Sequence, residues 1–157
     1  MTEIMPPSAR HVEAVSKMFW RRVRVNRALT AEQVIDDTGR VRGYVDEKVL
    51  ATMPGVGNGP EEVKVWFFDL DYDPTPKELE SEYQLRRLKP DAVALAKANK
   101  DDPALADERP NACQWGLGED GKASCAVFLR LCDWRSVHVH RRDDRWIRRY
   151  RFAGVRK

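Results

Sequence analysis

An uninterrupted apolar run in the middle of the chain constrains its fold most strongly. Val65, Trp66, Phe67 and Phe68 follow one another with no polar residue between them. Successive side chains of a strand point to opposite faces, so a strand that carries such a run is buried on both sides. We therefore predict a central buried strand over Glu62–Leu70.

Helix start signals lie on both sides of this strand. Residues Thr75–Glu78 combine an N-cap threonine, a proline suited to the first helical position and the glutamate of a capping box. Thr30–Gln33 carries a similar capping box before a short helix that ends near Gly39. Pro90 precedes the alanine-rich segment Asp91–Asn99. We therefore predict a helical middle segment between the buried strand and the last third of the chain.

The N-terminal segment has the apolar spacing of a helix. Val15, Phe19 and Val23 recur at four-residue steps after Ser8, which is a suitable N-cap. We predict a basic amphipathic helix here. Because valines also alternate with arginines, a strand over Trp20–Arg27 is the alternative. The polar face of the helix would form a second basic patch of four cations: Arg10, Lys17, Arg21 and Arg24.

The last third of the chain is predicted to be an antiparallel β-meander. Gln114–Leu117 and Lys122–Leu131 flank a Gly-Glu-Asp-Gly sequence that suits a hairpin turn. Arg135–His140 and Arg145–Ala153 follow as two further strands. The fold class is therefore α+β. A chain of 157 residues has the length of one domain, at ~100–200 residues, so we expect a single domain over 1–157.

Cysteine usage and the lack of long apolar segments indicate a reducing compartment. The three cysteines, Cys113, Cys125 and Cys132, include no closely spaced pair, so we interpret them as buried free thiols. Met1–Arg10 lacks the basic and apolar regions of a signal peptide, and no apolar run approaches the ~20 residues of a membrane span. We expect a cytoplasmic protein with no cofactor and no membrane partner.

Charge is distributed unevenly along the chain. The formal net charge is only +3, yet residues 61–108 carry 7 basic and 13 acidic side chains. Residues 109–157 carry 12 basic and 5 acidic side chains. The basic end is either a surface for an electrostatic partner or a segment that folds against the acidic middle and is neutralised by it. The sequence leaves both interpretations open.

The acidic residues after the buried strand are weak candidates for a metal site. Asp69, Asp71 and Asp73 alternate along an extended segment, and with Glu80 their spacing resembles an EF-hand calcium loop. Pro74 stands where that loop needs a glycine, and a strand precedes it where an EF-hand has a helix. The alternative role of these carboxylates is to end the strand and to favour the N-terminus of the next helix.

The same stretch contains a short phosphatase-like motif. Phe68–Asp71 is similar to the first motif of haloacid dehalogenase-type phosphatases, in which the two aspartates are the nucleophile and a general acid. Those enzymes continue with Gly-Thr, whereas Tyr72-Asp73 stands here, and only about 85 residues follow. The resemblance covers four residues and predicts no such phosphatase.

His138 and His140 form a second weak metal candidate. Their spacing on a strand points both imidazoles to the same side, as metal ligands require. A third ligand would have to come from His11 or Cys132. We favour the alternative of two polar residues on the solvent face of an edge strand, because no ligand spacing extends the pair.

The arginine-rich, aromatic C-terminus is the main candidate binding surface. In residues 145–152 alternation places Trp146, Tyr150 and Phe152 on one face and most of the arginines on the other. Arginine suits phosphate and carboxylate groups, and aromatic rings stack on bases. The alternative is a buried aromatic row with solvated arginines opposite. The candidate residues are Arg135, Arg141, Arg142, Arg145, Trp146, Arg148, Arg149, Tyr150 and Arg151.

These observations favour a binding protein over an enzyme. The leading hypothesis is a non-enzymatic protein that docks a protein partner through its basic surface, as an inhibitor or accessory protein from a mobile element would. Nucleic-acid binding is the alternative. A third hypothesis, a small metal-dependent hydrolase or nuclease, requires the three aspartates to converge with His138 and His140. Exposure of the C-terminal aromatic residues would strengthen the first two hypotheses.

Overall fold

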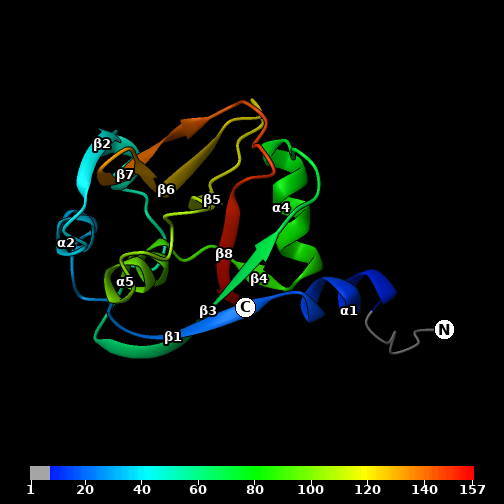
Figure 1. Cartoon of the computed structure of the whole chain (residues 1–157), viewed down its shortest axis with the longest axis horizontal. Helices are drawn as coiled ribbons and strands as arrows, with labels where there is room; N and C mark the ends of the chain where they lie inside the picture. Colours follow the sequence, from blue (N-terminus) through cyan, green and yellow to red (C-terminus); the bar gives the residue numbers. More distant parts are fainter. Residues whose placement is uncertain (1–7) are drawn as a thin grey trace.

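The strands of the described chain, from its N-terminal third to its C-terminal end, form one eight-stranded sheet. The computed structural model describes residues 8–157 (Figure 1). The helices are α1 (Ala9–Ser16), α2 (Ala31–Asp37), α3 (Glu47–Leu50), α4 (Pro76–Leu85) and α5 (Ala92–Asp101). The strands are β1 (Phe19–Asn26), β2 (Val41–Val45), β3 (Pro60–Asp69), β4 (Leu88–Lys89), β5 (Asn111–Trp115), β6 (Ala123–Leu131), β7 (Trp134–Arg142) and β8 (Arg151–Arg156). The expected α+β class is confirmed.

The strand order places the C-terminal strand inside the sheet. The order is β1-β3-β8-β5-β6-β7-β2, and the short β4 pairs with the end of β8. β5, β6 and β7 are antiparallel neighbours, as predicted. β8 does not continue their meander: it lies between β3, to which it is antiparallel, and β5, to which it is parallel. The predicted four-stranded meander is therefore wrong at its last strand.

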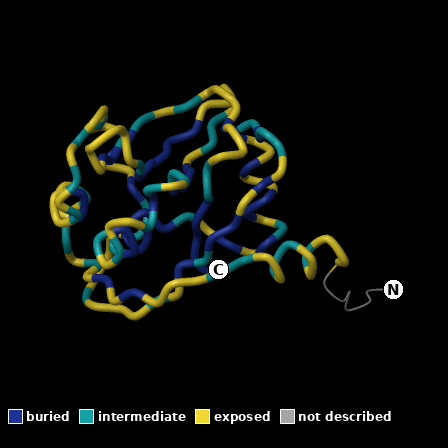
Figure 2. The backbone as a smooth tube through the Cα atoms, viewed as in Figure 1, coloured by how far each residue is buried: buried dark blue, intermediate teal, exposed yellow. Residues whose placement is uncertain are grey.

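Both faces of the sheet are covered, as the apolar run in β3 requires. Val65 and Phe67 face the layer that contains α2, α3 and α5, whereas Phe68 faces the layer that contains α4 (Figure 1). The predicted central buried strand is confirmed, with Trp66 only partly buried. Figure 2 shows the buried backbone running through the inner strands and the sides of the helices that face them.

The helix starts in the middle of the chain follow the sequence signals closely. Thr30 and Thr75 both form complete capping boxes, with Gln33 and Glu78 at the third helical positions. α5 is mostly buried, and its four alanines are among its buried residues. These local signals are confirmed because side-chain to backbone hydrogen bonds at a helix end depend little on the rest of the fold.

The N-terminal prediction is wrong beyond the first two turns of helix. Ser8 caps α1 as predicted, but α1 ends at Ser16 and Phe19–Asn26 is strand β1. Along its whole length β1 pairs with β3, and Val23 and Val25 are buried at the two-residue period of a strand. Met1–Pro7 lie outside the described residues. Within residues 8–157 no helix is long and apolar enough to cross a membrane.

The predicted second basic patch is therefore divided between different elements. Arg10 lies on α1 and Lys17 is its C-cap, whereas Arg21 and Arg24 lie on β1. Alternation places Arg21 and Arg24 on opposite faces of that strand. The four cations do not form the single helix face that we expected.

All three cysteines are free thiols, as predicted. Burial was predicted for all three, but only two of them are buried. Cys113 and Cys125 lie in the core, whereas Cys132 is exposed in the turn between β6 and β7. Burial raises the pKa of the Cys113 thiol well above its usual value and raises the pKa of Cys125 to about 12. Cys132 has a φ of 53°, which fits its position in a tight turn.

At Gly154 in β8 the backbone of β4 and the ring of Tyr83 approach the strand closely. A Cβ atom at this position would lie 2.7 Å from the Lys89 carbonyl oxygen and 3.0 Å from a Tyr83 ring carbon. Gly154→Ala should lower the free energy of unfolding by about 1–3 kcal/mol, because β4 and α4 would have to move away. Gly57→Ala is the control, since its nearest neighbour lies 3.9 Å away. Urea unfolding measures both, and equal stabilities would contradict the packing of β4 on β8.

Thiol chemistry checks the burial of the cysteines. One thiol should react with a thiol reagent in the native protein, and two more should react only after unfolding, since nucleophilic attack requires an accessible thiolate. Cys132→Ser should abolish the native reaction. A rapid native reaction in that variant would show that Cys113 or Cys125 is accessible.

Candidate functional site

The acidic residues after β3 are ion-paired with the basic C-terminal segment. Asp69 accepts hydrogen bonds from Arg151 Nε at 3.0 Å and Nη2 at 3.2 Å, and Arg109 Nη1 lies 3.2 Å from the same carboxylate. Asp73 accepts from the Arg148 backbone N–H at 2.9 Å and from its Nε at 3.2 Å. These bonds lower the pKa of the Asp73 carboxyl, the backbone N–H contributing most. The acidic middle of the chain thus folds against the basic end.

The metal hypotheses gain no support from this geometry. Within residues 8–157 no group of three His, Cys, Asp or Glu side chains lies close enough to hold a metal ion. Asp71 does not gather with Asp69 and Asp73 around a common point, since Arg148 and Arg151 occupy the two neighbouring carboxylates.

His138 has a structural role at the edge of the sheet. Its Nδ1 accepts a hydrogen bond from the Tyr44 backbone N–H at 3.1 Å. Gly43 lies against the imidazole, where a Cβ would come within 2.2 Å of the ring. The register of β2 on β7 shifts at this point. His140 lies beside Cys125, with 3.9 Å between Nε2 and Sγ. The two histidines thus contact different neighbours.

The C-terminal aromatic residues belong to the core. Trp146 and Phe152 are fully buried, and Tyr150 packs partly buried beside them. Trp146 Nε1 donates a hydrogen bond to Gln114 Oε1 at 2.9 Å, and the Arg142 guanidinium lies 4.4 Å from the Trp146 ring centroid. The structure therefore has the alternative that we considered, a buried aromatic row. The segment presents arginines to solvent without exposed aromatic rings beside them.

Most of the predicted C-terminal arginines contact a carboxylate of the protein itself. The pairs are Arg135 with Asp107, Arg141 with Asp120, Arg145 with Glu78, Arg148 with Asp73 and Arg151 with Asp69. Within residues 8–157, Arg142 and Arg149 have no carboxylate within ion-pair distance. Only part of the predicted surface therefore has charge that is free for a partner.

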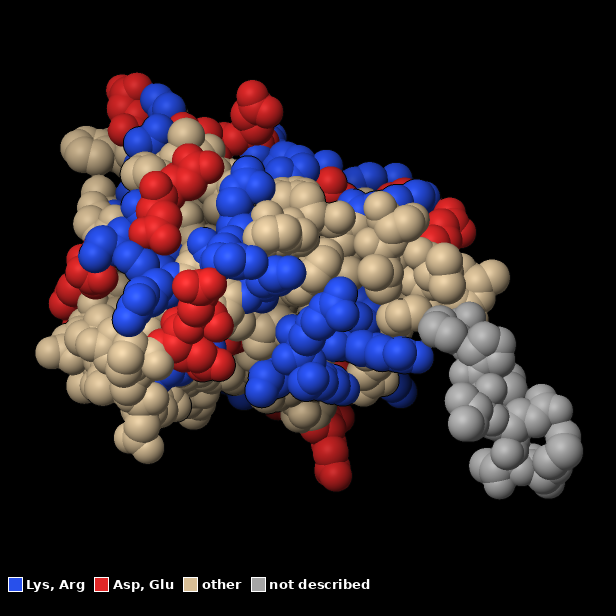
Figure 3. All heavy atoms as spheres, turned by 90° about the horizontal axis from the view of Figure 1, so that it is seen from below, with Lys and Arg blue, Asp and Glu red and all other residues tan. Residues whose placement is uncertain are grey.

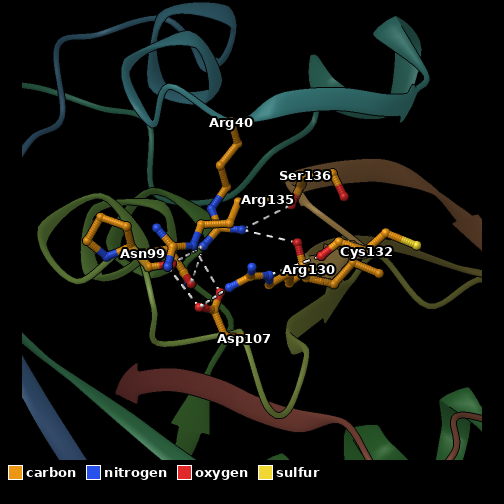
Figure 4. Close-up of polar contacts among 9 residues, drawn as sticks. Arg40, Asn99, Asp107, Arg130, Cys132, Arg135 and Ser136 are labelled. Atoms are coloured by element: carbon orange, nitrogen blue, oxygen red, sulfur yellow. Dashed lines mark hydrogen bonds and ion pairs between the residues drawn. The ribbon is translucent and has the colours of Figure 1, made fainter.

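A polar network around Asp107 shows how these arginines stabilise the fold (Figure 4). Asp107 accepts hydrogen bonds from Arg135 Nε at 3.0 Å and from Arg130 Nη1 at 3.2 Å, and the bonds from Arg135 are the main reason why its pKa is lowered. Arg40, just before β2, donates to the Leu129 and Ser136 carbonyl oxygens at 3.3 Å each. The network joins β2, β6 and β7 to the segment after α5.

A different basic surface, which we did not predict from the sequence, lies on β1, β3 and β8. We call it the basic sheet face, and it consists of Trp20, Arg22, Arg24, Lys64, Trp66 and Arg156. Trp20 pairs with Trp66 across the strands, with ring centroids 6.3 Å apart, and is 41% exposed. Figure 3 shows lysine and arginine side chains gathered on the side of the molecule where β1 lies.

Cations surround the two tryptophans of this face. Lys64 Nζ lies 4.4 Å from the Trp20 ring centroid, and the Arg156 guanidinium lies 4.7 Å from that of Trp66. Glu62 is the carboxylate that contacts the face, 3.4 Å from Arg22, and both side chains are more than half exposed. Such an exposed ion pair contributes little to stability and is easily opened. Positive charge on the face therefore exceeds negative charge.

The alternation in the sequence carried a signal for this face. Trp20, Arg22 and Arg24 lie two residues apart, so a strand places them together on one side. The helix prediction separated them, because the four-residue apolar steps from Val15 to Val23 obscured the two-residue step from Val23 to Val25.

The partly buried imidazole of His138 gives a pH-dependent prediction. The pKa of His138 lies below its ordinary value of 6.5. The main cause is the partial burial of the imidazole, and the second is the charge of His140. The unfolded state then binds a proton more readily than the folded state, so the free energy of unfolding should fall as pH decreases below about 6.5. His138→Asn, which keeps an acceptor for Tyr44, should show a smaller loss between pH 7.5 and pH 5.5. Urea unfolding at both pH values measures this, and identical losses would contradict it.

No family model matches the sequence, and neither a curated protein nor a solved structure is similar enough to match it. The site is therefore defined by its own chemistry: an open sheet surface with an exposed tryptophan and an excess of cations.

Proposed function

We propose that this protein is a non-enzymatic binding protein that docks an anionic macromolecule on its basic sheet face. The observation that carries the proposal is the exposed indole of Trp20, which lies among Arg22, Lys64 and Arg24 on an open sheet surface. Tryptophan and arginine are the residues that contribute most to binding at interfaces. The surplus of cations would steer a partner of opposite charge towards the face.

The C-terminal arginines are less available to a partner than the cations of the basic sheet face. Five of them hold carboxylates of the protein itself, so a partner would have to compete with existing ion pairs. On the basic sheet face, Arg24, Lys64 and Arg156 have no carboxylate within ion-pair distance among residues 8–157. A partner can bind these three without displacing an internal ion pair.

The alternative of a metal-dependent hydrolase or nuclease has less support. It requires Asp69 and its neighbours, at the end of β3, to meet His138 and His140 on β7. Three strands lie between β3 and β7 in the sheet. At ~4.8 Å per strand step, the two groups are separated by roughly 19 Å across the sheet, too far to share one metal ion.

Elution from a heparin column tests the proposal, because heparin is a generic polyanion. Arg24→Glu/Lys64→Glu should elute at clearly lower salt than the wild type, since exposed charges act through a screened electrostatic attraction. The matched control is Lys48→Glu/Lys122→Glu, which makes the same change of net charge at two exposed lysines on α3 and in the β5–β6 turn. The control should elute close to the wild type.

Two results would contradict the proposal. Equal shifts for both double variants would mean that only net charge matters and that the basic sheet face has no special role. Wild-type elution at or below physiological salt would mean that the protein has no useful affinity for polyanions.

A further inference from the structure

We propose that the partner of the basic sheet face is a single-stranded nucleic acid, whose bases stack on Trp20 and whose phosphates contact the surrounding cations. This inference rests on the function proposed above and names the class of its partner. Three features of the face support it: the type of exposed side chain, the open shape of the surface and a basic pocket beside it.

The exposed side chain is an aromatic ring on the surface of a sheet. Trp20 stands on the edge strand β1 with Trp66 beside it on β3, and its side chain is among the exposed large hydrophobic residues of the sheet. Aromatic rings in such positions stack on the bases of single strands, and every base has a π-face that such a ring can contact. Cations beside the ring then meet the phosphates of the same strand.

A basic pocket of about 380 Å³ adjoins the face at the end of β8. It lies between α1, the C-terminal end of α4 and β8, and Arg156 belongs to both the pocket and the face. Among residues 8–157, no carboxylate side chain lines it. Its lining residues are His11, Val15, Met18, Arg86, Arg87, Arg156 and Lys157.

The buried arginine of this pocket keeps unused hydrogen-bonding capacity. Arg86 is 8% exposed, and both hydrogen bonds that it donates, to the backbone and side chain of Glu82, come from Nη1. Its Nε has no hydrogen-bond partner within residues 8–157. Glu82 lies 2.8 Å from Arg86 and balances its charge. The cationic environment that suits a phosphate group of the bound strand therefore comes from Arg87, Arg156 and Lys157.

The exposed ring separates a single strand from the other anionic partners. A duplex presents phosphates but hides the faces of its bases in the stack, so it would use the cations and leave Trp20 without a role. A stretch of acidic side chains, such as poly-glutamate, presents carboxylates that also require the cations alone. Dependence of binding on the indole ring distinguishes a single strand from a duplex, and direct comparison with poly-glutamate distinguishes it from an acidic peptide.

Fluorescence anisotropy with a labelled 15-nucleotide mixed-sequence DNA or RNA strand tests the inference. Trp20→Ala should weaken binding of the single strand about tenfold or more, as the loss of base stacking predicts. Trp134→Ala is the matched control, because Trp134 is also exposed, at 64%, and lies on β7 far along the strand order. It should bind as the wild type does. Trp20→Phe, which keeps a ring, should lose less affinity than Trp20→Ala, and thermal melting shows whether each variant is folded.

The salt dependence gives an independent measurement. Lys64→Ala and Arg156→Ala should each reduce the slope of log K against log salt by about 0.7, the value for one lost phosphate contact on a single strand. Unchanged slopes in both variants would overturn the proposed phosphate contacts.

Other outcomes separate the inference from the function on which it rests. Retention on heparin without binding of either strand would overturn the single-strand inference and leave the proposed function standing. The same inference fails if a matched duplex or a poly-glutamate peptide binds as tightly as the strand, or if Trp20→Ala binds the strand as the wild type does. Loss of both heparin retention and strand binding would overturn the proposed function itself.

Discussion

The position of β8 in the middle of the sheet is the constraint on which the rest of the structure depends. The last strand of the chain joins β3 to β5, and its residues alternate between the two layers: Phe152 packs beneath α4, whereas Ala153 and Val155 pack beneath α5. Neither layer of the core is complete without it. The pair Asp69–Arg151 lies directly beside the paired phenylalanines of β3 and β8 and favours this register.

The uneven charge of the sequence follows from the same constraint. The basic end has to enter a sheet next to an acidic segment, and its arginines meet carboxylates at Asp69, Asp73, Glu78 and Asp107. Each exposed pair contributes little to stability, but each places a carboxylate beside a cation of that region. On the basic sheet face, by contrast, the carboxylate contact is the exposed Arg22–Glu62 pair, which leaves Arg24, Lys64 and Arg156 for a partner.

The sequence was sufficient for the features that depend on neighbouring residues. The two capping boxes, the buried run of β3 and the three consecutive strands β5 to β7 could all be predicted, since a cap, a doubly buried strand or a hairpin is encoded within a few residues. The insertion of β8 could not be predicted, because no local pattern tells a strand which distant strand it will pair with. The basic sheet face was missed for a related reason: Trp20 and Lys64 meet only when β1 pairs with β3.

The proposed binding surface consists of β1, β3 and the end of β8, whereas the arginines of residues 141–151 serve mainly the fold. Backbone amide chemical shifts of the ¹⁵N-labelled protein, followed while a single-stranded oligonucleotide is added, test this residue by residue. The shifts should change most at Phe19–Asn26, Lys64–Trp66 and Arg156. Changes centred on residues 141–151, with β1 unaffected, would contradict it.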